Sequence, residues 1–307
     1  MTIKEDIKNE LLANRPNLSE NSIKTYVSIL SNLYKKVFPG DEHKLSNFNK
    51  QDEIIEYLND VDGSKRKTIL ASLVVLCKDH NDKYTELMNQ DSANYSKEQK
   101  KQKRTEKQTE NWVEQDELTE IISNLKEQMN EIMKSRTQLS MVGLQKIQNY
   151  VMLCLMSGLY MDSIRRALDW SEMKIKNATE DDNEIILNSR KQSKFIFRKY
   201  KTARFLGVQE EIISPELKKI LTKWLSLLTA LCPDNEYLFI DNNCNKLTPV
   251  KINQRLNKIF GRKASVNILR HSLITEKYKN LPSLEEMKED AERNGHTLMQ
   301  ELEYIKR

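Results

Sequence analysis

Apolar residues recur at helical spacing through the first part of the chain. Residues 3–12 form one amphipathic run, and residues 18–38 form a second that ends at Phe-Pro-Gly. Shorter runs at 54–58 and 65–80 keep the same spacing of three and four, so each predicts a further helix. Four short helices over residues 1–95 predict a small helical domain with its own core.

Residues from about 111 onward form the second predicted domain. Helical periodicity returns first, and the run at 141–158 is apolar enough for a central buried helix. Short stretches rich in β-branched and aromatic residues then predict a three-stranded antiparallel sheet, with a tight connection around Gly207; they are residues 184–188, 194–200 and 208–213. Further helices are predicted at 112–125, 215–231, 248–260 and 266–275. The predicted fold is mostly α: a small helical domain followed by a mixed α/β, mainly helical domain over residues 111–307.

A basic stretch at residues 96–110 separates the two predicted domains. Residues 97–107 contain six basic and two acidic side chains and no aliphatic anchor. Such a segment is either a solvated linker or a linker that lies along phosphates, where each neutralised phosphate releases counterions. The candidates for DNA contact are four cations of this linker and three at the start of the fourth predicted helix: Lys100, Lys101, Lys103 and Arg104, and Lys65, Arg66 and Lys67. The net charge of +5 is too modest to establish nucleic-acid binding by itself.

Membrane insertion, export and zinc binding have no support in the sequence. No run of about 18 apolar residues is present, and the N-terminus lacks the apolar core of a secretory signal. The four cysteines have scattered spacings that do not fit a zinc site. Cys77 and Cys154 lie in apolar runs and are expected in the core. We therefore expect an intracellular protein from a reducing compartment.

The C-terminal part of the chain combines three residues that suggest chemistry. Arg270 lies in an apolar helical run, beside the apolar stripe. A buried arginine needs an anion for its donors, whereas a surface arginine could pair with Glu276. A Gly-His pair ends at His296, and Tyr304 follows eight residues later.

Four stretches resemble the boxes of one enzyme family. Residues 267–272, Asn-Ile-Leu-Arg-His-Ser, resemble the box of tyrosine recombinases (the phage integrase family) that usually reads His-x-x-Arg-His. The Gly-His pair at 295–296 followed by Tyr304 is similar to that family's Gly-His and nucleophilic tyrosine. Residues 157–170 are similar to its first-arginine box, and residues 199–207, Lys-Tyr-Lys-Thr-Ala-Arg-Phe-Leu-Gly, to its lysine hairpin. The boxes occur in the family's order and look most like those of recombinases from large DNA viruses, virophages and related mobile elements.

The resemblance implies that Arg166 and Arg270 bind the scissile phosphate. Charge builds on the non-bridging oxygens of a phosphodiester during displacement, and two planar guanidinium forks can hold them. Arg165 is the alternative to Arg166. We prefer Arg166 because Asp169 then follows three residues later, as the acidic residue does in the family.

The remaining residues of the implied site supply the nucleophile and the protons. Tyr304 would attack phosphorus, with Tyr278 as the only nearby rival. Lys201 would protonate the leaving 5′ oxygen as a general acid, and His296 would donate a hydrogen bond to the phosphate. Asn267 stands where the family usually has histidine; it can donate a hydrogen bond but cannot shuttle a proton.

The resemblance thus implies site-specific cleavage and rejoining of double-stranded DNA through a 3′-phosphotyrosine, by a homo-tetramer on two duplexes. One phosphate ester is exchanged for another, so neither ATP nor a metal is required and no cofactor is expected. If the source is viral, the protein acts in the cytoplasm or nucleus of a host cell. Two alternatives stay open: a type IB topoisomerase, which uses the same residues as a monomer, and a catalytically silent DNA-binding protein of this fold.

Overall fold

The chain divides into two compact units. The computed structural model describes residues 2–40, 44–135, 138–161, 163–188, 190–293 and 297–299. One unit is Met1–Lys103 together with Pro282–Arg307, and the other is Arg104–Leu281. The break after Lys103 falls inside the basic stretch at 96–110. The described residues after Leu281 are grouped with the first unit. The domain bounds predicted from the sequence stay a prediction.

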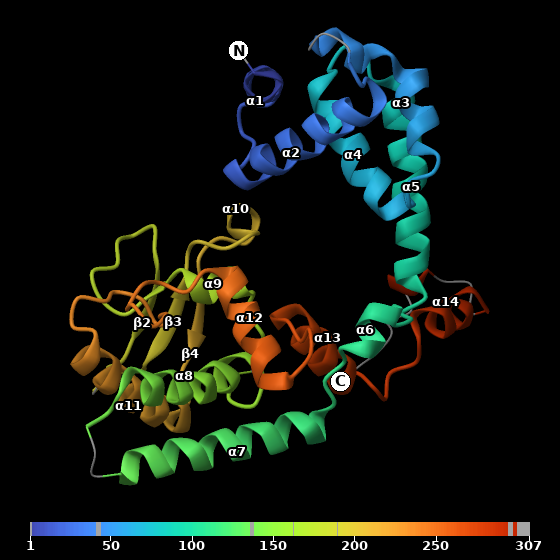
Figure 1. The fold of residues 1–307 in the computed structure, drawn as a ribbon. Helices are drawn as coiled ribbons and strands as arrows, with labels where there is room; N and C mark the ends of the chain where they lie inside the picture. The colour runs from blue at the N-terminus through green and yellow to red at the C-terminus, as the bar shows by residue number, and fades with distance from the viewer. Residues whose placement is uncertain are drawn as a thin grey trace. The chain divides into compact units, whose positions relative to one another are not determined.

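The first unit is helical (Figure 1). Its elements are α1 (Ile3–Asn14), α2 (Glu20–Val37), the short 3-10 helix η1 (Leu45–Asn49), α3 (Gln51–Leu58), α4 (Gly63–Leu76), α5 (Asp82–Lys100) and α14 (Leu284–Arg293). The four helices predicted from the apolar spacing are α1 to α4. Their inward faces meet in one core, in which Leu11, Leu30 and Phe48 are fully buried.

Helix α5 is the main difference from the predicted first domain. It replaces the expected start of a linker and continues to Lys100. Its fully buried residues are Tyr84 and Asp91, and Leu87 and Met88 are partly buried against the core, so its apolar face is short. Arg66 of α4 donates to both carboxylate oxygens of Asp91, at 2.8 and 2.7 Å. Tyr84 donates to the Phe48 carbonyl at 2.7 Å. Polar contacts and this short apolar face together hold the helix.

The second unit combines a helical core with a small sheet (Figure 1). Its helices are α6 (Glu106–Glu110), α7 (Gln115–Lys134), α8 (Met141–Met156), α9 (Ala167–Ser171), α10 (Ala203–Leu206), α11 (Pro215–Leu231), α12 (Pro249–Phe260) and α13 (Val266–Lys277). Its strands are β1 (Met173–Lys174), β2 (Asn183–Ile186), β3 (Lys194–Phe197) and β4 (Gln209–Ile212). Helix α8 packs against α7, α11 and α13 and buries most of its side chains, which confirms the predicted central helix.

The sheet confirms the three predicted strands and adds a fourth. Its order is β1-β2-β3-β4, with β2, β3 and β4 antiparallel and the two-residue β1 parallel to β2. The predicted tight connection around Gly207 is wrong. A turn and the single helical turn α10 separate β3 from β4, and Gly207 ends α10 with a positive φ of 66°. Glycine suits that position because other residues are strained there.

Two cysteines are joined, although the sequence pattern pairs none. Cys232 follows α11 and forms a disulfide with Cys244. Cys77 and Cys154 are buried, as predicted. Within the described ranges, no helix is long and apolar enough to span a membrane. The same residues contain no group of three or more metal-ligating side chains close enough to hold an ion.

Candidate active site

Arg166 stands at the start of α9, where its backbone is tied to Asp169. Its N–H donates to Asp169 Oδ2 at 3.2 Å, and the Asp169 N–H donates back to the Arg166 carbonyl at 3.0 Å. An acidic residue three places into a helix can satisfy a free N–H at the helix start in this way. The side chain of Arg166 is half-buried and makes no hydrogen bond or ion pair with any described residue.

Arg270 lies on α13, which is held close to the end of α8. Gly158 follows α8 with a φ of +78°, and a Cβ atom there would collide with the side chain of Leu273 on α13. Ser272 donates to the Val113 carbonyl and accepts from Gln115 at 3.2 Å, which fixes α13 against the start of α7. These contacts place Arg270 half-buried beside the first-arginine box.

The charges of the two arginines act on one another. Burial is the largest influence that lowers the pKa of Arg270, and the charge of Arg166 is the next. Arg165 adds to this repulsion, whereas Asp169 opposes it. Neither Arg166 nor Arg270 has an ion pair within the described part of the chain. The structure therefore brings together the two predicted phosphate-binding arginines with unoccupied donors.

Asp169 is the buried carboxylate that the cations share. It is only 3% exposed, and burial is the main cause that raises its pKa above the usual range. The charges of Arg165, Arg166 and Arg270 all work against that rise. Its Oδ1 has no hydrogen-bond partner among the described residues. Asp169 is thus one carboxyl group among three guanidinium cations, so positive charge is in excess at the start of α9.

Arg165 differs from its neighbour because it is enclosed by protein. Its Nε lies 3.4 Å from Asp169 Oδ2, and its Nη1 donates to Gln209 Oε1 at 2.5 Å. Its guanidinium carbon lies 3.9 Å from the centre of the Phe197 ring and 4.9 Å from that of Tyr200. The side chain is 13% exposed. Arg165 therefore joins the start of α9 to both ends of the β3–β4 connection.

Lys201 lies in that connection, immediately after Tyr200. It is exposed and has no ion pair with a described residue. Tyr200 donates its hydroxyl to the Gly207 carbonyl at 2.6 Å, which closes the connection on itself. An exposed ammonium group on a turn is free to reach a substrate atom. Sequence reasoning proposes Lys201 as a site residue, which stays a prediction. It could not find the Arg165 and Gln209 contact behind it, because no local pattern reveals such long-range partners.

Asn267 precedes Arg270 by three residues on α13, so the two are neighbours on the helix surface. It is exposed, as is His271. His296 and Tyr304, the predicted phosphate donor and nucleophile, lie outside the described residues. The rival Tyr278 follows α13 and is 51% exposed.

The predicted DNA-contacting cations of α4 have different surroundings. Lys65 is exposed. Arg66 is engaged with Asp91, and the two side chains are only 18% and 4% exposed. Lys67 lies 3.9 Å from the centre of the Tyr95 ring. Arg66 thus has a structural role in joining α4 to α5, and Lys65 is the cation best placed to meet a phosphate.

The cations of the basic stretch are mostly exposed. Lys100 and Lys103 have no ion pair with a described residue, while Lys101 pairs with Glu98 at 2.6 Å. Arg104 lies 3.7 Å above the Trp112 ring. Its contact with a glutamate is long, so the guanidinium stays accessible.

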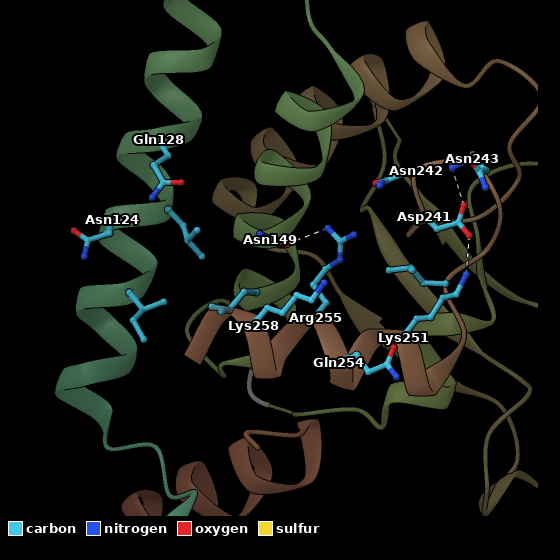
Figure 2. A pocket seen from close by; sticks show the side chains of 14 residues that line it. Asn124, Gln128, Asn149, Asp241, Asn242, Asn243, Lys251, Gln254, Arg255 and Lys258 are labelled. Atoms are coloured by element: carbon cyan, nitrogen blue, oxygen red, sulfur yellow. Dashed lines mark hydrogen bonds and ion pairs between the residues drawn. The ribbon is translucent and has the colours of Figure 1, made fainter. Parts of the chain in front are cut away.

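A cleft lies elsewhere in the second unit, between α7 and α12, and has a volume of about 670 Å³ (Figure 2). Arg255 points into it and donates to the Gln145 carbonyl at 3.2 Å and to Asn149 Oδ1 at 3.1 Å. Burial lowers the pKa of Arg255. Amide side chains dominate the polar lining, and none of the sequence-predicted site residues contributes to it. This cleft has no pairing of a nucleophile with a base.

Comparison with known proteins finds similarity only at the level of structure. No protein-family model matches the chain, and no curated protein matches it. The chain is similar to XerA recombinase at a TM-score of 0.37 and 13% identity, covering 99% of this chain and 94% of that one. It is also similar to XerH site-specific recombinase bound to difH substrate in a pre-cleavage complex, at a TM-score of 0.41 and 15% identity, covering 91% and 85%. These scores are low, so the likeness alone assigns no activity.

Proposed function

We propose that this protein cleaves and rejoins double-stranded DNA through a phosphotyrosine intermediate, as a tyrosine recombinase. The supporting observation is the pair formed by Arg166 and Arg270. Two half-buried guanidinium groups from α9 and α13 repel one another and have unoccupied donors. Burying like charges without a partner is costly, so such a site favours an anion.

A phosphodiester suits this site. Negative charge gathers on its two non-bridging oxygens in the transition state, and two guanidinium forks can hold them with charge-assisted hydrogen bonds. Binding the anion also relieves the repulsion between Arg166 and Arg270. Because the charge grows during displacement, the site stabilises the transition state more than the ground state.

Three further residues would carry the bond changes. Tyr304 loses its phenolic proton to solvent and attacks phosphorus, and the bond from phosphorus to the 5′ oxygen breaks. Lys201 gives that oxygen a proton, which leaves a 3′-phosphotyrosine and a free 5′ hydroxyl. His296 donates to a non-bridging oxygen. Asn267 can hydrogen-bond the phosphate but cannot accept the tyrosine proton.

Covalent capture tests the proposal. The substrate is a pool of random-sequence duplexes that carry a nick near the centre. After cleavage beside the nick, the short segment with the free 5′ hydroxyl dissociates, so the strand cannot be rejoined. The protein–DNA adduct therefore accumulates and survives SDS. The adduct should vanish in Tyr304→Phe and persist in the matched control Tyr278→Phe. An adduct that disappears in the control variant instead would assign the nucleophile to Tyr278. Complete absence of an adduct, with duplex binding intact, would favour a silent DNA-binding protein.

We further propose that four copies act on two duplexes, and that the biological role is movement or integration of a viral or other mobile DNA element inside a host cell. Sedimentation of the protein with duplexes recovered from the adduct pool tests the assembly. Relaxation of supercoiled plasmid by the monomer, without strand exchange between duplexes, would indicate a type IB topoisomerase.

A further inference from the structure

The cleft between α7 and α12 has the size of a site for a small organic ligand. Its volume of about 670 Å³ lies within the roughly 300–1,000 Å³ of such sites in proteins. Helices α7, α8 and α12 and the segment 241–247 supply its lining (Figure 2). Among the described residues, none of those assigned to DNA cleavage lines it. The proposed reaction therefore gives this cleft no occupant.

Arg255 brings an unbalanced charge into the cleft. Its Nη1 donates to the Gln145 carbonyl and to Asn149 Oδ1, and both acceptors are neutral. Its Nε and Nη2 make no hydrogen bond with a described residue and are not sealed within the protein. Arg262, just after α12, differs because its guanidinium donates to both carboxylate oxygens of Glu117. A half-buried guanidinium with open donors favours an anion.

The carboxylate in the described lining of the cleft is already engaged. Asp241 Oδ2 accepts from Lys251 at 2.8 Å, and Oδ1 accepts from two backbone N–H groups of its own turn, at 2.9 and 3.0 Å (Figure 2). Lys258 lies one turn after Arg255, is exposed and has no ion pair with a described residue. Two cations thus remain for a ligand. Their charge matches the roughly −1.5 to −2 of a phosphate monoester at pH 7.

Amide groups and aliphatic side chains form the rest of the lining. The amides of Asn124, Gln128 and Gln254 have no hydrogen-bond partner among the described residues. Each amide presents an acceptor and donors side by side, a pattern that pairs with the edge of a nucleobase. Aliphatic side chains such as Ile121 and Ile259 suit the apolar faces of the same ring.

The segment that carries Asp241 is held in place without a ligand. Gln148 of α8 donates to the Ile240 carbonyl at 2.9 Å and accepts from the Ile240 N–H at 2.8 Å. The disulfide between Cys232 and Cys244 ties the following turn to the end of α11. A site whose walls are already fixed loses less conformational freedom when a ligand binds.

We propose that this cleft binds a nucleoside 5′-monophosphate, with its phosphate on Arg255 and Lys258 and its base between the amides and the aliphatic side chains. A guanidinium fork and a lysine point charge are a common pair for one phosphate. A single nucleotide fits better than duplex DNA, because a duplex is held through many phosphates and this cleft has two free cations. The site does not depend on the proposed DNA cleavage.

Calorimetry on the full chain without DNA tests the ligand class. At least one of AMP, GMP, CMP and UMP should bind at one site per chain, with a dissociation constant below about 1 mM. Inorganic phosphate alone and the matching nucleoside alone should each bind at least about ten-fold more weakly, because each lacks half of the contacts. Failure of all four nucleotides to bind would overturn the proposal. Equal affinity for inorganic phosphate and every nucleotide would also overturn it, since the base would then add nothing.

A pair of tryptophan variants tests the location without changing charge. Gln254→Trp places an indole in the cleft and should weaken nucleotide binding by at least about ten-fold through steric overlap. The matched control is Val250→Trp, because Val250 is on the same helix, is 64% exposed and lies outside the lining; it should bind as wild type does. Equal affinities in the two variants would place the nucleotide elsewhere and overturn the proposal.

Charge variants test the phosphate contacts. Arg255→Lys keeps a cation but loses the fork, so the affinity should fall about ten-fold while the denaturant midpoint stays near that of wild type. Lys258→Ala should weaken binding about three-fold, and Lys223→Ala, an exposed lysine of α11 outside the cleft, should not change it. An unchanged affinity in Arg255→Lys would overturn the proposal.

Two further outcomes would assign the nucleotide or the cleft differently. A loss of nucleotide binding in Arg166→Ala, with Gln254→Trp unaffected, would move the nucleotide to the arginine pair and overturn the cleft site. Displacement of the nucleotide by duplex DNA, together with weaker duplex binding in Gln254→Trp, would give the cleft to the DNA backbone and overturn it as well.

Discussion

Replacing Arg165 and Arg166 one at a time separates a structural arginine from a phosphate-binding one. Arg166→Ala removes a half-buried cation that has no described partner and that repels Arg270. Its loss should leave the free energy of unfolding within about 1 kcal/mol of wild type, because no stabilising contact is removed. The rate of cleavage should fall by about 10²–10³-fold, the usual cost of losing one transition-state donor. Arg166→Lys should recover little, because an ammonium group cannot form the guanidinium fork.

Arg165→Ala should have the opposite primary effect. It removes the near partner of a carboxylate that is 3% exposed, together with the bond to Gln209 and two ring contacts. Breaking a buried ion pair costs about 3–5 kcal/mol. That is a large part of the roughly 5–15 kcal/mol by which a domain is stable. Adding Asp169→Asn should restore part of the loss, because the unpaired charge is then gone.

The stability deficit of Arg165→Ala should depend on pH in a direction that a general packing defect would not produce. Burial already raises the pKa of Asp169, and removing Arg165 takes away its largest opposing influence, so the pKa rises further. A carboxyl whose folded pKa is raised contributes stability below its unfolded pKa of about 4 and loses it as pH rises through the folded pKa. The deficit of Arg165→Ala should therefore be smaller near pH 4 than near pH 7.

Denaturant titration and single-turnover cleavage of the captured duplex, measured on the same variants, decide which of the two arginines is structural and which binds the phosphate. A stable but inactive Arg165→Ala beside an unstable but active Arg166→Ala would refute the assignment and place the phosphate on Arg165. A deficit in Arg165→Ala that grows at low pH would refute the proposed role of Asp169.

Three further expectations follow from particular contacts. Lys201→Ala should cleave an ordinary duplex far more slowly than wild type, yet approach wild-type rates on a substrate with a 5′-bridging sulfur, because a thiolate leaves without a proton; equal slowing on both substrates would remove Lys201 as the acid. Arg66→Ala should lower the free energy of unfolding by about 3–5 kcal/mol, since the buried bidentate pair is broken, whereas Lys65→Ala should lower only the salt slope of DNA binding; a stable Arg66→Ala with weakened DNA binding would return Arg66 to the interface. Under non-reducing conditions, alkylation and mass spectrometry should find Cys232 and Cys244 protected, and reduction should lower stability by about 3 kcal/mol for a 12-residue separation; two alkylated thiols there without reductant would exclude the bond.

Helix positions in this chain could be predicted wherever an apolar stripe meets the core. The helix predicted at 215–231 matches α11 to the residue, because a serine cap and a first-turn proline precede a clear stripe. Helix α5 could not be predicted in this way. Its apolar face is limited to Tyr84, Leu87 and Met88, and the Arg66–Asp91 pair and the Tyr84 hydroxyl add contacts between distant residues that have no period in the sequence.

The sequence proposed residues for the site, and their roles stay predictions; it did not reveal the contacts around them. Arginines within apolar or glycine-rich boxes point to phosphate binding, so Arg166 and Arg270 were identifiable as candidates. Arg165 and Arg166 have identical chemistry and adjacent positions, so sequence alone favoured one only by its spacing from Asp169. Their surroundings separate them: one is enclosed by Gln209 and aromatic rings, and the other has no described partner.

In the proposed reaction, this arrangement lets the buried Asp169 sit among the cations without competing with the phosphate. A carboxylate that paired face to face with Arg166 would occupy the fork that the phosphate needs. Asp169 instead directs Oδ2 at the Arg166 backbone N–H and at Arg165, so it lowers the local positive charge while leaving the Arg166 fork unoccupied. Arg165 in turn holds Asp169 from one side and the connection that carries Lys201 from the other. In the proposed reaction, Arg165 therefore links the phosphate-binding arginine to the connection that carries the general acid.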